Sequence, residues 1–145
     1  MALRFSTGLR NHLLNSIGNS ASGVSFDGGT LSIYTGSQPS TADAAPIGTL
    51  LVEVTLPADA FAVASNGIMA KSGTWQATAV AAGTAGWFRL ARAGDSGGSS
   101  STDIRIDGAV TAVGGGGELQ VDNPSLAAGQ QFTVGTFSIS FPAEG

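Results

Sequence analysis

Ser96 has the setting that most suggests chemistry, because it lies in the glycine-rich segment GDSGG at residues 94–98. A serine in such a turn can attack a carbonyl carbon when a histidine takes its proton and a buried aspartate orients that histidine. The chain has one histidine, His12, which lies in RNHLLNSIG, a segment with the pattern of a helix. Asp43 and Asp59 fall between His12 and Ser96, so the chain order of a triad is possible. We do not, however, expect this helix to supply a buried base beside Ser96.

The surroundings of Ser96 favour a surface turn. GDSGG resembles the nucleophile segment of chymotrypsin-like serine proteases, but that fold is a double β-barrel that needs a much longer chain, and a motif counts only in its structural context. The flanking sequence ARAGDSGGSSSTD is a run of glycine, serine and aspartate between two alternating apolar segments, which is typical of a long hairpin loop. We therefore expect a loop here, and a protein that is not an enzyme.

Few residues of the chain are suited to binding a metal or a cofactor. Transition metals prefer histidine and cysteine, and the chain has one histidine and no cysteine. The segment GGGG at 114–117 lacks the GK[ST] ending and the following helix of a phosphate loop. Calcium could use aspartate oxygens, although no segment has the spacing of a known calcium loop. The aspartates concerned are Asp27, Asp43, Asp95, Asp103, Asp107 and Asp122. We expect no metal and no cofactor.

Carboxylate pairs and aromatic platforms are two further candidate sites. The ten acidic residues are spread along the chain, and Glu53 alone falls in the middle of a predicted strand, where it is expected to face solvent. Trp75 and Trp87 could stack on sugars or bases, but aromatic residues on paired strands more often pack in the core. We favour core packing for both tryptophans.

Composition limits the classes of partner. At 145 residues the chain predicts one domain, and only 11% of its residues are charged, with a net charge of -4. A single lysine and five scattered arginines predict no nucleic-acid-binding face. No segment reaches the roughly 20 apolar residues of a membrane span, and the arginines near the start interrupt any secretory signal. We expect a soluble, unprocessed chain made in a cytoplasm.

An amphipathic helix is predicted at the N-terminus. Ser6 or Thr7 can cap it, and Gly18 can end it. Its apolar positions are Leu9, Leu13, Leu14 and Ile17, and the polar residues Arg10, Asn11, Asn15 and Ser16 lie opposite. A helix this short needs a surface to pack on, either its own β domain or a neighbouring subunit.

Alternation with a period of two follows the helix. Strands are predicted at 31–34, 50–56, 74–80, 86–92, 103–107 and 118–121. The strand at 50–56 should lie in a sheet with one wet side, residues 35–48 form a long polar connection, and AAGTAG at 81–86 reads as a hairpin-like connection. In QQFTVGTFSISF the apolar phase slips by one, which a β-bulge at Gly135 would correct.

These elements predict a mainly β protein, a single antiparallel β-sandwich or small barrel with a short N-terminal α-helix. Residues 1–18 form the helical segment and residues 24–145 the β domain. Seven or eight short strands with glycine-rich turns fit an antiparallel sandwich or barrel better than an α/β fold. A jelly-roll, an immunoglobulin-like sandwich and a small barrel all accept this pattern.

Four stretches make nearly the whole chain resemble small structural proteins of tailed bacteriophage virions. They are MALRFSTGLRNHLL, LSIYTGSQPSTADAAPIGTLLVEVTL, AGWFRLARAGDSGG followed by DIRIDGAV, and NPSLAAGQQFTVGTFSISFPA. The resemblance implies a virion protein assembled in the host cytoplasm. Many such proteins decorate or cement the head shell, and others form the neck, collar or tail.

The resemblance implies the major capsid protein or other virion proteins as partners, and a homo-oligomer as the state of the chain. Capsid decoration is the first hypothesis, a neck, collar or tail role the second, and a carbohydrate-binding adhesion module using Trp87, Trp75 or Tyr34 the third. The helix and the loop at 35–48 are the expected contact elements. Their candidate contact residues are Arg4, Phe5, Leu9, Arg10, Leu13, Gln38 and Pro39.

Overall fold

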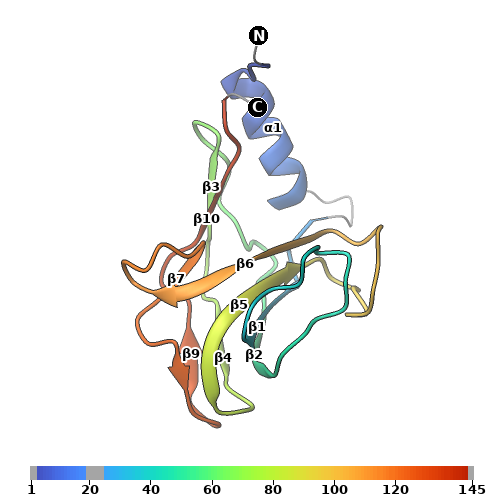
Figure 1. The fold of residues 1–145 in the computed structure, drawn as a ribbon. Coiled ribbons are helices and arrows are strands. Elements are labelled where there is room, and N and C mark those ends of the chain that lie inside the picture. The colour runs from blue at the N-terminus through green and yellow to red at the C-terminus, as the bar shows by residue number, and fades with distance from the viewer. Residues whose placement is uncertain (1–2, 19–24, 144–145) are drawn as a thin grey trace.

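A twisted sheet with strand order β2-β1-β5-β6-β7 forms the centre of the molecule in the computed structural model, which describes residues 3–18 and 25–143 (Figure 1). One helix, α1 (Thr7–Gly18), precedes it. The strands are β1 (Thr30–Thr35), β2 (Leu50–Thr55), β3 (Ile68–Ala70), β4 (Gln76–Thr78), β5 (Gly83–Ala91), β6 (Arg105–Ala112), β7 (Leu119–Val121), β8 (Ser125–Leu126), β9 (Gln131–Thr133) and β10 (Ser138–Ser140). The predicted fold class is confirmed: the protein is mainly β and sandwich-like, with one short N-terminal helix.

Alternation along the central strands gives the sheet an inner face that carries the core. Leu31 and Ile33 of β1 pair with Leu90 and Phe88 of β5, and all four side chains are buried. All the pairings of this sheet are antiparallel except that of β6 with β7, which is parallel. Phe88 and Leu90 of the strand predicted at 86–92 therefore face the core.

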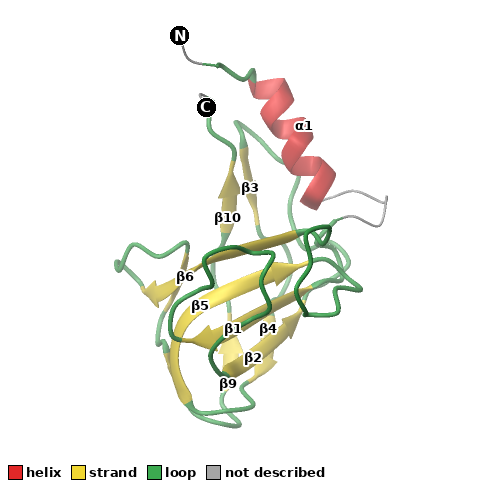
Figure 2. Cartoon of the chain, turned by 45° about the vertical axis from the view of Figure 1, so that its right-hand side comes forward, coloured by secondary structure: helices red, strands yellow, loops and turns green. Residues whose placement is uncertain are grey.

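A second layer, the ladder of β4 with β9, covers the inner face, with Trp75, Phe132 and Val134 in the shared core (Figure 2). The predicted hairpin across residues 81–86 is wrong, because β4 pairs with β9 rather than with β5. Glycine explains the difference. A Cβ on Gly86 would collide with the backbone of Gly36. Strand β5 can therefore pass this close to the end of β1 only with glycine at position 86.

The phase slip in QQFTVGTFSISF has a different cause from the predicted bulge. The chain leaves β9, where Thr133 pairs with Gln76, and enters β10, where Ser138 pairs with Ala70. The two apolar phases therefore belong to two ladders, and the bulge predicted at Gly135 is wrong. Phe132 and Phe137, on either side of the change, are both buried.

Residues 3–18, 62–70 and 138–143 project from the sandwich and are called the stalk; the other described residues are the body (Figures 1 and 2). The stalk contains α1, β10 and a tight hairpin that turns at Asn66 and Gly67. Both residues have positive φ, 53° and 71°, and Ser65 and Ile68 exchange two backbone hydrogen bonds of 2.9 Å across the turn. An Asn-Gly pair suits this two-residue turn, because both central residues need the left-handed region.

Candidate functional site

Helix α1 begins as predicted and then packs with an unexpected side inward. The Ser6 hydroxyl accepts a hydrogen bond from the Leu9 N–H at 3.2 Å, so Ser6 is the N-cap. Leu14 is buried and Ile17 packs against the core, which ties the lower half of the helix to its own β domain. The N-terminal half makes polar contacts with the stalk hairpin instead.

Three polar side chains of α1 bind the backbone of the stalk. Asn11 Oδ1 accepts a hydrogen bond from the Gly67 N–H at 2.7 Å, and Asn15 Oδ1 accepts one from the Ala64 N–H at 2.8 Å. Arg10 Nη1 donates to the carbonyl oxygens of Asn66 and Phe141, each at 3.3 Å. The face of the helix expected to meet water is therefore the face that recognises the hairpin.

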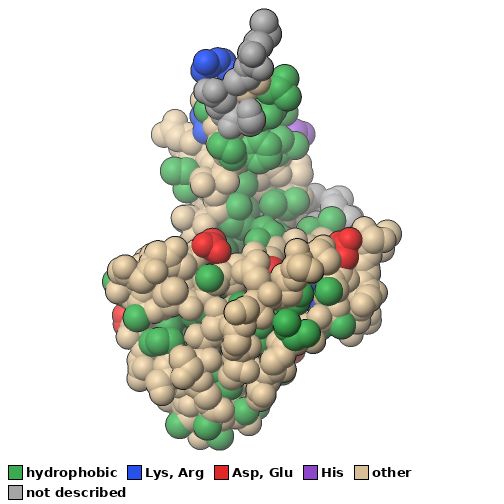
Figure 3. Space-filling view, in the orientation of Figure 1, with side chains coloured by type: hydrophobic (Ala, Val, Ile, Leu, Met, Phe, Trp, Pro, Cys, Tyr) green, Lys and Arg blue, Asp and Glu red, His purple; other side chains and the backbone are tan. Residues whose placement is uncertain are grey.

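The N-terminal part of the apolar face of α1, Leu9 and Leu13, is left open. Leu9 keeps 45% and Leu13 39% of its surface exposed. Among the described residues, eight large hydrophobic side chains are exposed, and five of them lie in the small stalk: Leu3, Leu9, Leu13, Val63 and Ile68. Figure 3 shows hydrophobic side chains along the stalk, above a body whose visible surface is largely neutral and polar. A concentration of exposed apolar side chains in a small region is characteristic of interaction sites.

The seven candidate contact residues divide into two groups. Arg4, Leu9, Leu13 and Gln38 are exposed. The other three face inward: Phe5 packs edge-on against Phe141 with ring centroids 5.4 Å apart, Arg10 binds the hairpin, and Pro39 is buried. The structure thus leaves Leu9 and Leu13 available to a partner and uses Arg10 of the same helix internally.

The body carries its own concentration of polar groups, on the outer face of the central sheet. Arg89 of β5 makes a two-pronged ion pair with Asp107 of β6, at 2.8 and 2.9 Å, and both side chains are only 4% exposed. Arg89 also donates to the Ala44 carbonyl at 2.8 Å, and the Trp87 indole N–H donates to the Ile47 carbonyl at 3.2 Å. The connection at 35–48 therefore covers this face at β5, which is why β5 is buried on both sides. The wet side predicted for the strand at 50–56 is found on β2, where Glu53 and Thr55 are exposed.

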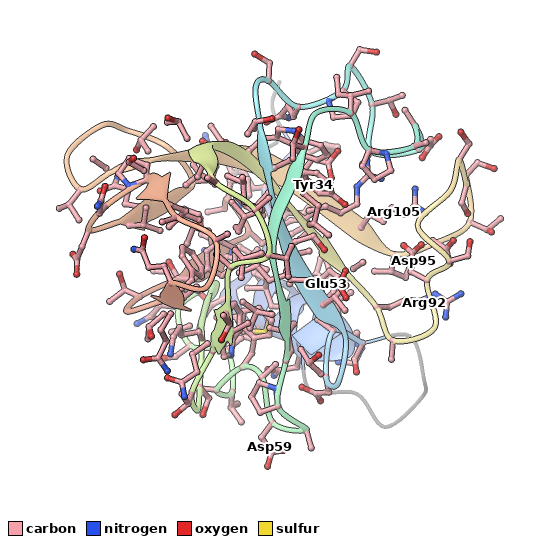
Figure 4. The ribbon with its side chains drawn as sticks, turned by 90° about the horizontal axis from the view of Figure 1, so that it is seen from below. Tyr34, Glu53, Asp59, Arg92, Asp95 and Arg105 are labelled. Atoms are coloured by element: carbon pink, nitrogen blue, oxygen red, sulfur yellow. The ribbon has the colours of Figure 1, made fainter. Side chains whose placement is uncertain are left out.

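The GDSGG segment forms a loop that hydrogen bonds hold in place at the edge of the outer face. Asp95 makes a two-pronged ion pair with Arg105 of β6, at 2.6 and 2.7 Å, and accepts the Gly97 N–H at 2.8 Å. The Arg105 hydrogen bond lowers the pKa of the Asp95 carboxyl, and Asp95 in turn raises the pKa of Arg105. Figure 4 shows Asp95, Arg92 and Arg105 gathered at one side of the sheet. The motif serves to hold the loop onto β6.

A hollow of about 160 Å³ lies beside this loop, lined by hydroxyl and carboxylate groups that include Ser32, Tyr34, Glu53 and Ser96. Burial raises the pKa of the Tyr34 phenol, so it stays protonated and can donate. His12 lies on the stalk helix, and the structure does not bring it to Ser96. Glu53 is exposed as predicted, and its carboxylate accepts the Ser32 hydroxyl at 3.4 Å.

The two tryptophans pack inside. Trp75 and Trp87 are both fully buried; Trp75 meets Phe61 edge-on at 5.2 Å, and Trp87 stacks on Tyr34 at 4.6 Å. Core packing is confirmed for Trp75, whereas Trp87 is buried under the connection at 35–48; neither can offer its face to a sugar in this fold.

The described residues form neither a metal-binding cluster nor a membrane-spanning helix. Within residues 3–18 and 25–143, no three histidine, aspartate or glutamate side chains come together as a set that could hold a metal ion. In the same ranges, no helix has the length and apolar content needed to cross a membrane.

The interactions that build the stalk were missed by sequence reasoning. Asn66-Gly67 is a strong hairpin signal that went unused, because the flanking strands are short and their alternation is weak. The hydrogen bonds from Asn11 and Asn15 to the hairpin span 56 and 49 residues, and no local pattern announces them.

Comparison of the chain with models of known protein families, with curated protein sequences and with solved structures finds no match. What is known of the stalk and of the ion pairs of Arg89 and Arg105 on the outer face therefore comes from their own geometry.

Proposed function

We propose that this chain is a structural protein of a tailed-bacteriophage virion, which decorates the outer surface of the head shell and docks through its stalk. The observation that carries the proposal is the orientation of α1. Its polar side chains bind the hairpin, while Leu9 and Leu13 face outward. A helix held in this way is already ordered before docking, so binding a partner costs little further ordering of the chain.

Charge distribution supports docking by the stalk. The stalk contains Arg4 and Arg10 and no carboxylate among its described residues, whereas nine of the ten acidic residues lie in the body. In the body, three arginines are neutralised by buried or half-buried aspartates. A partner surface that is apolar and acidic would accept the stalk and repel the body, which gives the contact an orientation.

Decoration also suits the size of the contact. The apolar surface of one helix is modest, but an oligomer that binds several identical shell subunits gains from multivalency. The sequence resemblance to virion structural proteins supplies the class of partner, the major capsid protein or another virion protein, and the stalk supplies the contact element.

The test is a binding experiment with heads assembled without this protein. Replacing both Leu9 and Leu13 with serine should weaken binding to the heads by about tenfold or more, because burying one leucine contributes roughly 1.5–3 kcal/mol. The matched control replaces Val80 and Val113 with serine; both lie on the body and are 68% and 69% exposed. Equal binding by the two double variants would refute docking through α1.

Copy number separates decoration from a neck, collar or tail role. We expect quantitative mass spectrometry of purified particles to find this chain at a simple fraction of the amount of the major shell protein. A few copies per particle would move the proposal to the neck or tail, and absence from particles would remove it.

A further inference from the structure

Strand β10 has one edge without a partner strand, on the side away from β3. Along the ladder with β3, the Lys71 N–H donates to the Phe137 carbonyl at 2.8 Å and the Phe141 N–H donates to the Gly67 carbonyl at 2.9 Å. Hydrogen-bonded pairs alternate in an antiparallel ladder, so the backbone groups of Ser138 and Ser140 point away from β3. No other described residue pairs with them.

Beyond the shortness of β10, this edge lacks two usual protections against added strands. Charged residues or proline at an edge normally discourage pairing, and TFSISF at residues 136–141 contains neither. Ser138 and Ser140 are also exposed. An extended chain could therefore reach their N–H and C=O groups.

Two adjoining cavities lie along β10, and the larger one also reaches Ala70 of β3. The first, of about 240 Å³, has apolar walls from Phe88, Ile106 and Ile139. The second, of about 270 Å³, is polar and includes Gln120. Glu118, Phe137 and Ser138 line both, so the cavities form one groove along β10. Side chains two residues apart on a strand point to the same side about 7 Å apart, a spacing suited to neighbouring cavities.

The charge of the groove is acidic. Its charged lining residues are Asp107 and Glu118. Asp107 is neutralised by Arg89, whereas Glu118 is exposed and uses only Oε1, which accepts the Ala109 N–H at 3.0 Å. Glu118 thus has an oxygen available for a cation, and no lysine or arginine of the described chain lines either cavity.

We propose that β10 binds an extended peptide segment of another protein by strand addition. The segment pairs with the backbone of Ser138 and Ser140, places an apolar side chain in the first cavity, and places a lysine or arginine two positions away beside Glu118. This site is separate from Leu9 and Leu13 of α1. It is a second binding surface, which recognises a peptide and not the head shell.

The test pans a display library of random short linear peptides on the immobilised full chain. We expect enrichment of peptides in which a lysine or arginine stands two positions from an apolar residue. Ser140→Pro should weaken their binding by about tenfold or more, because proline removes the outward N–H without touching the hydrogen bonds to β3. Ser140→Thr, which keeps the N–H, is the matched control and should bind normally.

Glu118→Gln tests the charge. Glutamine keeps an acceptor for the Ala109 N–H, so the fold is retained, and binding of the basic peptides should weaken while that of versions with alanine in place of the basic residue should not change. The Leu9 and Leu13 double variant should still bind the peptides, which separates this proposal from shell docking.

Three outcomes would overturn the proposal. Panning could enrich no common pattern, or the enriched peptides could bind the Ser140→Pro variant as well as they bind the original chain. Analytical ultracentrifugation could instead find a dimer that Ser140→Pro dissociates, in which case a second copy of the chain occupies the edge.

Discussion

Stalk and body hold their arginines in different ways. In the body, Arg89 donates two hydrogen bonds to Asp107, and Arg105 donates two to Asp95. All four side chains are almost completely buried. In the stalk, Arg10 binds two backbone carbonyls and the Thr7 hydroxyl, and its Nε is buried without a partner among the described residues. The body pairs these arginines with aspartates, whereas the polar side chains of the stalk helix bind backbone groups of the hairpin and of β10.

The same contrast holds for apolar surface. The body buries an aromatic cluster that includes Phe61, Trp75 and Phe137, while the stalk turns leucines outward. A region completed by its own loops needs no partner to be stable. A region that exposes its apolar face has surface that a partner could bury, and this difference directs both proposals to the stalk and its base.

The largest effect is expected when the body loses one charge of its most buried pair. Asp107→Asn leaves the Arg89 guanidinium buried without a counterion, which should lower the free energy of unfolding by about 3 kcal/mol. Urea denaturation followed by tryptophan fluorescence measures it, since Trp87 lies in the same layer.

Asp122→Asn is the control for that substitution, because Asp122 is an exposed acidic residue of the body. We expect it to change the free energy of unfolding by less than about 0.5 kcal/mol. Equal losses for the two variants would show that the pair of Arg89 and Asp107 contributes nothing specific, and the contrast with the stalk would fail.

A smaller and local effect is expected in the stalk. Replacing Asn11 and Asn15 with alanine removes the acceptors for the Gly67 and Ala64 N–H groups, and should reduce the local stability of the stalk by about 1–2 kcal/mol. Hydrogen exchange at these two amides should become faster, while exchange in β5 should stay as slow as before. A uniform acceleration would mean that stalk and body unfold as one unit.

The elements that local pattern predicted are those that pack by their own alternation. The helix at 7–18 and the strands around 50–56 and 86–92 follow their sequence periods, because one face of each meets the core. Pattern also predicted that both tryptophans would be buried. It could not predict that the loop at 35–48 covers the outer face, since that depends on hydrogen bonds from Arg89 and Arg105 across 45 and 63 residues.

The stalk was mispredicted for a related physical reason. Amphipathic analysis assumes that polar side chains face water, but Asn11 and Asn15 instead accept hydrogen bonds from the backbone of the hairpin. The same analysis assigned Arg10 to a partner, whereas it holds Asn66 and Phe141 within the chain. Only the three-dimensional pairing of helix and hairpin distinguishes these uses.

The smallest energetic effect is expected on acidification, which should destabilise a loop of the body and leave the stalk unchanged. The Arg105 hydrogen bond holds the pKa of Asp95 below that of an aspartate in an unfolded chain, about 3.9, so the pair stabilises the fold fully above that value. The stabilisation is lost as the pH falls through the lower, folded-state pKa, and the loop at 93–104 should then loosen. The described stalk has no carboxylate, so its amides should not respond.

Hydrogen exchange at Gly97, whose N–H binds Asp95, can be followed against Gly67 from neutral pH downward. Asp95→Asn should remove the Gly97 transition, and a midpoint above about 4 would contradict the assignment.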